Sequence, residues 1–155
     1  MKRFISIIII VLSALTVVFA GNKQPRFDHI DADFKMTNTR GQMTEPLTQY
    51  GHFVYSAIAG VSVVYENSIE EEIPTEISRF IMKFLGSETI RSCAEYKVLL
   101  DGDMVTLYPK KQAVKQHFLQ AQVFFNPLTG FVREVVAIAP SGELTTIEVF
   151  NLECR

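Results

Sequence analysis

The side chains that could do chemistry in this chain are few and lie far apart. His29, His52 and His117 have none of the short spacings that metal sites use, so we expect no metal site. Cys93 could pair with His117 as a nucleophile and its base. Because Cys93 begins an alternating, strand-like stretch and no helix, a structural thiol or a half-cystine is the better interpretation. With no phosphate-binding loop either, we expect neither an enzyme nor a cofactor.

Charged residues add only weak signals. The acidic run 70–72 lacks the regular oxygen-ligand spacing of a calcium loop, so we expect a solvated connector. Lys110, Lys111 and Lys115 could meet phospholipid headgroups or an acidic partner, although a solvated turn is the favoured interpretation. The 15 basic and 17 acidic residues give a net charge of −2. This balance has no electrostatic signature of nucleic-acid binding.

The first twenty residues have the organisation of a secretory signal peptide. Lys2 and Arg3 precede an apolar stretch over residues 4–20, which ends in the kind of residues that signal peptidase reads. A membrane anchor is the alternative, but this stretch is only about the minimum length for crossing a bilayer. We therefore expect cleavage of residues 1–20, work outside the cytosol, and a single mature domain over residues 21–155.

Two cysteines remain in the mature chain, and the sequence leaves their state open. Export permits a disulfide between Cys93 and Cys154. Closing so long a loop would stabilise the fold by about 4 kcal/mol in the chain-entropy model. Two unpaired thiols are an equal alternative, because one pair of cysteines is thin evidence for a bridge.

Most of the mature chain alternates apolar and polar residues with a period of two, which predicts half-buried antiparallel strands. Asp101-Gly102-Asp103 is a hairpin signal, and Pro109 ends the next strand because it cannot donate to a ladder. Within the stretch that begins at Phe118, the odd-numbered residues from Leu119 on form the apolar face. The predicted strands span residues 34–39, 47–58, 61–65, 96–100, 104–108, 118–125, 131–139 and 145–152.

One segment has helical periodicity. Pro74 suits the first helical position, and Gly86 can end the helix in a left-handed conformation. The apolar residues between them recur at i, i+3, i+4, i+7 and i+8, which is one stripe of an amphipathic helix. The stripe consists of Ile77, Phe80, Ile81, Phe84 and Leu85.

The fold class expected is α+β, mostly antiparallel β, with the strands in a curved meander and one amphipathic helix over it. A single helix can cover only part of an apolar concave face. Either the sheet curls into a filled small barrel, or it leaves an apolar cavity that could take an acyl chain. Aromatic residues at strand spacing are usually core, so composition alone favours the filled barrel. The expected concave-face residues are Phe34, Phe53, Tyr55, Val63, Tyr96, Val98, Val123 and Phe125.

Several short motifs follow one another in a moderately specific order over residues 27–151. They are Phe34-Lys35-Met36-Thr37, Pro46-Leu47, Gly51-His52-Phe53-Val54-Tyr55, the run 105–111 (Val-Thr-Leu-Tyr-Pro-Lys-Lys), Val123-Phe124-Phe125, the run 140–147 and Phe150-Asn151. In this order they resemble the periplasmic outer-membrane lipoprotein carrier family (LolA-like). Residues 66–73 are all that connects the strand ending at Tyr65 with the helix, where the family has another hairpin. The resemblance is therefore to a shortened variant.

The resemblance implies an incomplete, strongly curved barrel whose mouth is closed by a lid helix. It also implies a periplasmic carrier that takes acylated lipoproteins or lipids from an inner-membrane exporter to an outer-membrane acceptor. Such a carrier needs no catalytic residue and no cofactor. We expect a monomer. The expected ligand-binding residues are Leu47, Phe53, Tyr55, Val63, Tyr96, Val98, Val123 and Phe125 on the hollow, and Ile77, Phe80, Ile81 and Phe84 under the lid.

A second hypothesis belongs to a different class. The same strands could enclose a filled core, and the protein would then be a non-enzymatic module of the cell envelope. It would engage another protein through a sheet edge or through the convex face, since exposed edges can recruit strands.

Overall fold

The computed structural model describes residues 28–41, 45–67, 96–128 and 132–155. The expected signal peptide, the lid helix at residues 74–86 and Cys93 lie outside these ranges, as does most of the acidic connector.

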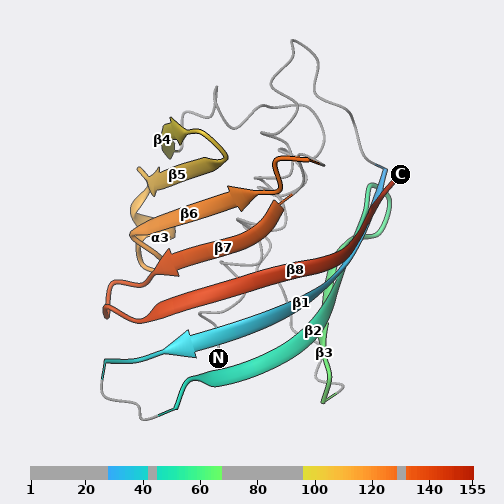
Figure 1. Ribbon diagram of the computed structural model, residues 1–155, viewed down its shortest axis with the longest axis horizontal. Helices are drawn as coiled ribbons and strands as arrows, with labels where there is room; N and C mark the ends of the chain where they lie inside the picture. Colours follow the sequence, from blue (N-terminus) through green and yellow to red (C-terminus); the bar gives the residue numbers. More distant parts are fainter. Residues whose placement is uncertain (1–27, 42–44, 68–95, 129–131) are drawn as a thin grey trace.

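Eight strands form one antiparallel sheet (Figure 1). The order across the sheet is β3-β2-β1-β8-β7-β6-β5-β4, so two meanders meet where β1 pairs with β8. A four-residue helix, α3 (Gln112–Lys115), joins β5 to β6. The strands are β1 (His29–Thr39), β2 (Leu47–Ser56), β3 (Gly60–Tyr65), β4 (Tyr96–Asp101), β5 (Met104–Pro109), β6 (Gln120–Phe125), β7 (Val132–Ile138) and β8 (Leu144–Cys154).

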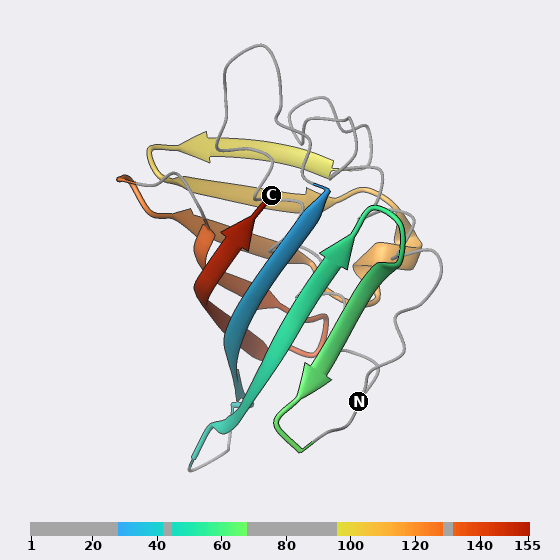
Figure 2. The ribbon, with the colours of Figure 1, turned by 90° about the vertical axis from the view of Figure 1, so that its right-hand side faces the viewer.

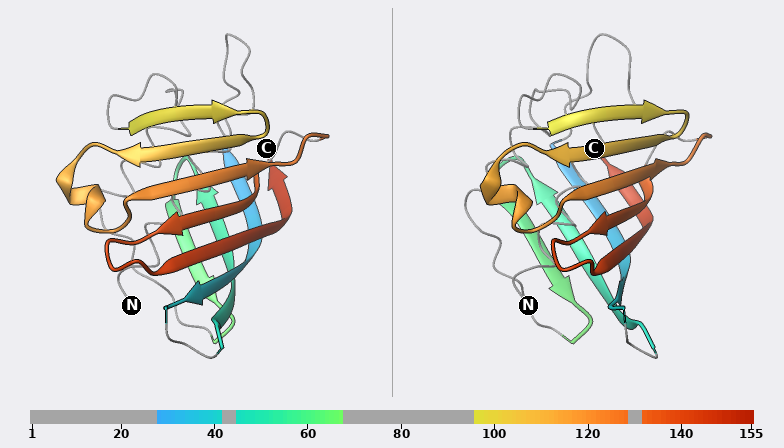
Figure 3. Two further views of the ribbon diagram at one scale, coloured as in Figure 1. Left: turned by 60° about the vertical axis from the view of Figure 1, so that its left-hand side comes forward. Right: turned by 90° about the vertical axis from the view of Figure 1, so that its left-hand side faces the viewer.

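The sheet is strongly bent and stays open. In Figure 2, β1, β2 and β3 cross in front of β5, β6 and β7 at a steep angle, and the two views of Figure 3 show the same bend from other sides. Within the described residues, β3 and β4 end the strand order and do not pair with each other. Register shifts between Asp31 and Asp33 and between Phe124 and Phe125 mark bulges, which add local twist. The expected mostly antiparallel, curved sheet is thus confirmed, whereas the lid helix lies outside the described residues.

Two strands are longer than the sequence pattern predicted. β1 begins at His29 and not at Phe34, because Ile30 and Ala32 already alternate with polar neighbours and are buried. β8 continues to Cys154, where its last residues pair with the start of β1. The long pairing of these two strands lies at the centre of the sheet.

The segment between β5 and β6 differs from the expected turn and strand. α3 occupies residues expected to be a turn, and Phe118 follows it, only 1% exposed and stacked on Tyr96 with ring centroids 6.3 Å apart. β6 begins at Gln120, so the strand alternation does not extend back to Leu119. Leu119 is therefore 47% exposed and does not lie on the apolar face, contrary to expectation.

The alternation of all eight strands places the apolar side chains on the inner side of the bend. These residues form one contiguous cluster that includes members of every strand. Phe34 meets Tyr65 edge to face, with ring centroids 5.8 Å apart, so aromatic contacts link β1 to β3 across β2. The core is therefore the inner face itself, and its residues are the ones that the alternation selects.

Gly51 holds the register of this face at one point. It pairs with Phe34, and a Cβ built at Gly51 would overlap the Phe34 ring, lying 2.8 Å from its Cε1 atom. The ring covers the glycine backbone of the neighbouring strand, an arrangement that only glycine permits. Because residue 51 has no side chain, the Phe34 ring can lie over its position and contact Tyr65 on β3.

We expect Gly51→Ala to lower the free energy of unfolding by about 1–3 kcal/mol, because the Phe34 ring must leave its rotamer or its contact with Tyr65. Urea denaturation measures the loss. Gly41→Ala is the matched control, since a Cβ there meets nothing within 4 Å, and it should change stability by less than about 0.5 kcal/mol. In a Phe34→Leu background the Gly51→Ala change should cost less; an unchanged cost would contradict the role of the ring.

Candidate functional site

The inner face of the sheet brings together most of the residues expected to line a hollow. Phe53 and Val63 are direct partners on β2 and β3, and Tyr55 follows Phe53 on the same side. At the other end of the sheet, Val123 on β6 and Val105 on β5 are partners. The expected residues that belong to the single core cluster or pack against it are Phe34, Phe53, Tyr55, Val63, Tyr96, Val98, Val123 and Phe125.

Solvent hardly reaches this face. Phe125 is 6% exposed and Val123 is fully buried, while Val98 is half-buried at the β4 edge. Burial, and secondarily the charge of Asp28, raises the pKa of the Tyr55 phenol. Among the described residues, this apolar face is therefore largely covered by the protein's own atoms.

Leu47 is the exception among the expected residues that the structure describes. It has the same parity on β2 as Phe53, but it is 51% exposed. Its partner on β1 is Asn38, whose buried side-chain oxygen accepts a hydrogen bond from Thr145 Oγ1 at 3.2 Å. The apolar face ends at this polar pair, so Leu47 lies on the rim, beyond the interior.

The lid residues and one cysteine cannot be placed. Ile77, Phe80, Ile81, Phe84 and Cys93 lie outside the described residues. Cys154 is a free thiol whose pKa is raised to about 11 by burial, which makes it unreactive near neutral pH.

The sequence reasoning missed about half of the inner face. The residues on β5, β7 and β8 were assigned to strands but not to the hollow, and Phe118 was assigned to a strand that begins later. The alternation itself was the signal that could have found them, once applied to every strand. The missed residues of the cluster are Ile30, Met36, Tyr65, Val105, Leu107, Phe118, Ala121, Val132, Val135, Ala137 and Ile147.

The outer face of β1 carries a second group that sequence reasoning missed. His52 on β2 lies between two carboxylates, with Nδ1 2.8 Å from Asp33 and Nε2 3.2 Å from Asp31. Asn151 donates a hydrogen bond of 2.9 Å to the other oxygen of Asp33. Asn151 has a φ of 51° at the β8 bulge, a conformation that asparagine tolerates better than most residues. The bulge thus turns an amide onto the carboxylate.

The pKa values in this group move as its contacts require. Hydrogen bonds from Asn151 and then His52 lower the pKa of the Asp33 carboxyl. The hydrogen bond to Asp33, with further help from the charges of Asp31 and Asp33, raises the pKa of His52 against the opposing effect of burial. The arrangement favours an imidazolium held between two carboxylates. The contacts of this group are electrostatic.

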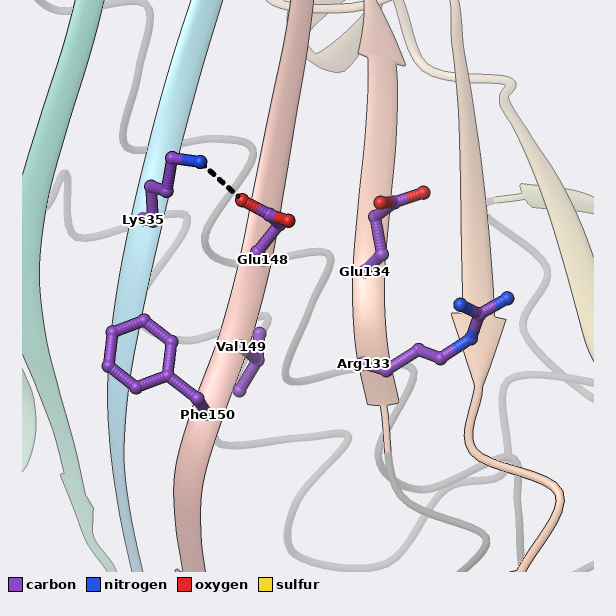
Figure 4. A pocket seen from close by; sticks show the side chains of 6 residues that line it. All are labelled: Lys35, Arg133, Glu134, Glu148, Val149 and Phe150. Carbon is purple, nitrogen blue, oxygen red and sulfur yellow. Dashed lines mark ion pairs between the residues drawn. The ribbon is translucent and has the colours of Figure 1, made fainter.

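A shallow pocket lies on the outer face near this group, over β1, β8 and β7 (Figure 4). Its volume is about 340 Å³, and its lining is mixed. Lys35 Nζ binds Glu148 at 3.0 Å, and Glu148 pairs across the strands with Glu134. Figure 4 shows Arg133 directed away from both acids; its Cζ lies 5.7 Å from the centroid of the Phe124 ring. The pocket is open, and its lining combines four charged side chains with Val149 and Phe150.

Other kinds of site are not found in the part of the chain that the structure describes. No group of three or more His, Cys, Asp or Glu side chains there is arranged to hold a metal ion. No helix in the described ranges has the length and hydropathy that crossing a membrane requires.

No protein-family model and no curated protein matches this sequence. Solved structures with a similar fold include a LolA superfamily protein from Nitrosomonas europaea, at 7% identity and a TM-score of 0.38, covering 94% of this chain and 92% of that one. An outer-membrane lipoprotein-sorting protein domain from Vibrio parahaemolyticus has 10% identity and a TM-score of 0.38, covering 83% and 86%. The family that the sequence resembles is therefore among the structural neighbours.

A third similar structure is MucB in the MucA/MucB complex of Pseudomonas aeruginosa, at 9% identity and a TM-score of 0.40. This likeness covers 94% of the present chain but 56% of that protein. At such identities and TM-scores, none of the three likenesses carries a conclusion about ligand or partner.

The His52 group generates a prediction about pH. Because the pKa of His52 is raised on folding, its stabilising contribution is fully present below the unfolded value of 6.5 and is lost as pH rises through the folded pKa. The unfolding free energy of wild type should therefore exceed that of His52→Gln by more at about pH 5.5 than at about pH 8.5. The change between the two pH values should be less than about 1 kcal/mol, because His52 is half exposed and solvent screens its charge. Urea denaturation at both pH values measures the difference.

His117→Gln is the control, because burial lowers the pKa of His117. The stabilising contribution of neutral His117 is lost as pH falls. The unfolding free energy of wild type should therefore exceed that of His117→Gln by more at the higher pH. A difference between wild type and His52→Gln that grows with pH would contradict the arrangement described for Asp31, His52 and Asp33.

Proposed function

We propose that this protein is a periplasmic carrier that binds the acyl chains of lipoproteins or lipids against its inner face and moves them toward the outer membrane. The observation that carries the proposal is the continuous apolar face on one side of a bent, unclosed sheet. The signal-peptide pattern of the first twenty residues supports the location. The LolA-like order of the motifs supports an inner-membrane exporter and an outer-membrane acceptor as partners.

The mechanism is an exchange of contacts. Each CH₂ group that leaves water for an apolar surface gains about 0.8 kcal/mol, so a long acyl chain can offset the loss of internal contacts. Aromatic side chains such as Phe53, Tyr55 and Phe125 would contact the chain of the lipid once the face opens. Because β3 and β4 do not pair, the face can widen without breaking a strand ladder. No covalent step and no cofactor is needed.

The near-complete burial of the inner face also favours a second candidate function. If the face is permanently filled, the protein is a non-enzymatic envelope module that binds another protein through a sheet edge or the convex face. Native mass spectrometry of the gently purified protein separates the two. Lipid adducts are expected for the carrier. Their absence, together with a partner recovered by crosslinking, is expected for the module.

Two consecutive phenylalanines provide a matched test of the carrier. Phe125 lies on the inner face and is 6% exposed, whereas Phe124 lies on the outer face beneath Arg133. Phe125→Ala should weaken the binding of a fluorescent acyl probe by about tenfold or more, given about 1.5–3 kcal/mol for one buried side chain. Phe124→Ala should leave the affinity unchanged. Fluorescence titration of both variants measures the effect.

Loss of a buried ring can cost about 3–5 kcal/mol of stability, so circular dichroism must first show that Phe125→Ala is folded. Phe125→Leu serves in its place if it is not, with a smaller loss of affinity. Wild type that binds no probe saturably, or two alanine variants with equal affinity, would rule out acyl binding on this face.

A further inference from the structure

The β4 strand ends the sheet with an unpaired edge. It pairs with β5 on one side, and residues 97–101 make no hydrogen bond on the other side within the described structure. Leu99 and Leu100 are each 47% exposed. Soluble proteins usually protect such edges, because an exposed apolar edge strand recruits another strand. Within the described residues, this edge is free to pair with another strand.

The hairpin shows which backbone groups are free. Asp101 and Met104 flank a two-residue turn and pair with each other. Flanking residues of such a turn form a hydrogen-bonded pair, and the hydrogen-bonded pairs then alternate along the strands. The N–H and C=O groups of Val98 and Leu100 therefore point away from β5, toward the open side.

We propose that the occupant is β4 of a second copy of this chain, paired antiparallel about a two-fold axis at Leu99. In this register Val98 is opposite Leu100 of the second copy, so the free backbone groups on both strands meet in hydrogen-bonded pairs. Leu99 is opposite its own equivalent. Each exposed leucine thus gains an apolar cross-strand neighbour: Leu99 its own equivalent, and Leu100 the Val98 side chain of the second copy.

The charges fit the same register. The outer face of β4 carries every second residue of the strand, here Lys97, Leu99 and Asp101. When Leu99 meets its equivalent, Lys97 of each copy is opposite Asp101 of the other. Opposite charges across strands stabilise a pair, and like charges destabilise it. An isologous contact requires this kind of self-complementarity.

The other edge of the sheet lacks this pattern. β3 (Gly60–Tyr65) has no charged residue, and its most exposed apolar side chain, Val64, is 37% exposed. Nothing on β3 would select one register over another. The proposed dimer therefore uses β4, whereas the sequence led us to expect a monomer. This inference does not depend on the carrier function.

The pairing surface is one short strand from each copy, smaller than a standard interface, so the dimer should be weak. We expect sedimentation velocity on protein expressed from the full-length sequence to show a monomer–dimer equilibrium between roughly 10 and 500 µM. Lys97→Asp should weaken dimerisation by about tenfold or more, because two carboxylates then face each other on both sides of the axis. The double variant Lys97→Asp/Asp101→Lys should restore it.

Lys110→Asp is the control, since Lys110 is exposed, lies outside β4 and undergoes the same charge change. It should dimerise as wild type does. Leu99→Cys gives a second readout: residues facing each other in a non-hydrogen-bonded pair have Cα atoms about 4.5 Å apart, within the range of a disulfide. Oxidation should crosslink Leu99→Cys into dimers and leave Lys110→Cys uncrosslinked. A protein that stays monomeric throughout the concentration range, a double variant without rescue, or growth beyond dimers would overturn the proposal.

Discussion

The alternation of side chains along eight paired strands is the constraint on which the rest of this structure depends. A slip of one residue in any strand would turn its apolar residues to the outer face, so the register must be held at particular points. Phe34 over Gly51 holds β1 against β2, and the buried hydrogen bond of Thr145 with Asn38 holds β1 against β8. Two bulges then change which residues face inward without breaking the ladders. The bulge on β8 also turns Asn151 onto Asp33, so the geometry of the outer face follows from the same register.

The inner face poses one physical question for function. Its side chains are packed and dry, which is the condition of an ordinary core, yet the strands that carry them do not close into a barrel. A closed barrel admits a ligand through its mouth, or otherwise by breaking hydrogen bonds between strands. An open sheet can admit one by exchanging apolar contacts, which have little directionality and are replaced by those of an acyl chain. A buried apolar face on a sheet whose described strands do not close is the feature that the proposed carrier and a filled core explain differently.

The extent to which the sequence predicted this structure varied with the kind of signal. Period-two alternation predicted the strands and put Phe53, Tyr55, Val63, Val123 and Phe125 on one face, because pleating converts parity directly into side. The alternation failed at two residues. Leu47 has the parity of the inner face but lies at the rim of the sheet. Leu119 continues the parity of β6 but precedes the start of that strand. It could not bring His52 to Asp31 and Asp33, because the pairing of β1 with β2 is a long-range choice of register. α3 was missed because four residues are too few for a helical period to appear.

The same openness explains why the two ends of the sheet differ. Pairing β3 with β4 would set Lys97 and Asp101 against a strand with no charged residue, so closure would leave both charges without a counterpart. The charges on β4 thus find counterparts in a second β4 strand but none on β3. A dimer formed in this way would fix the β4 end of each sheet in a continuous ladder. The β3 end, where Val61 and Val63 face inward and Val64 outward, would then be the side on which each inner face can open. Edge protection and access to the inner face would thus be assigned to opposite ends of one sheet.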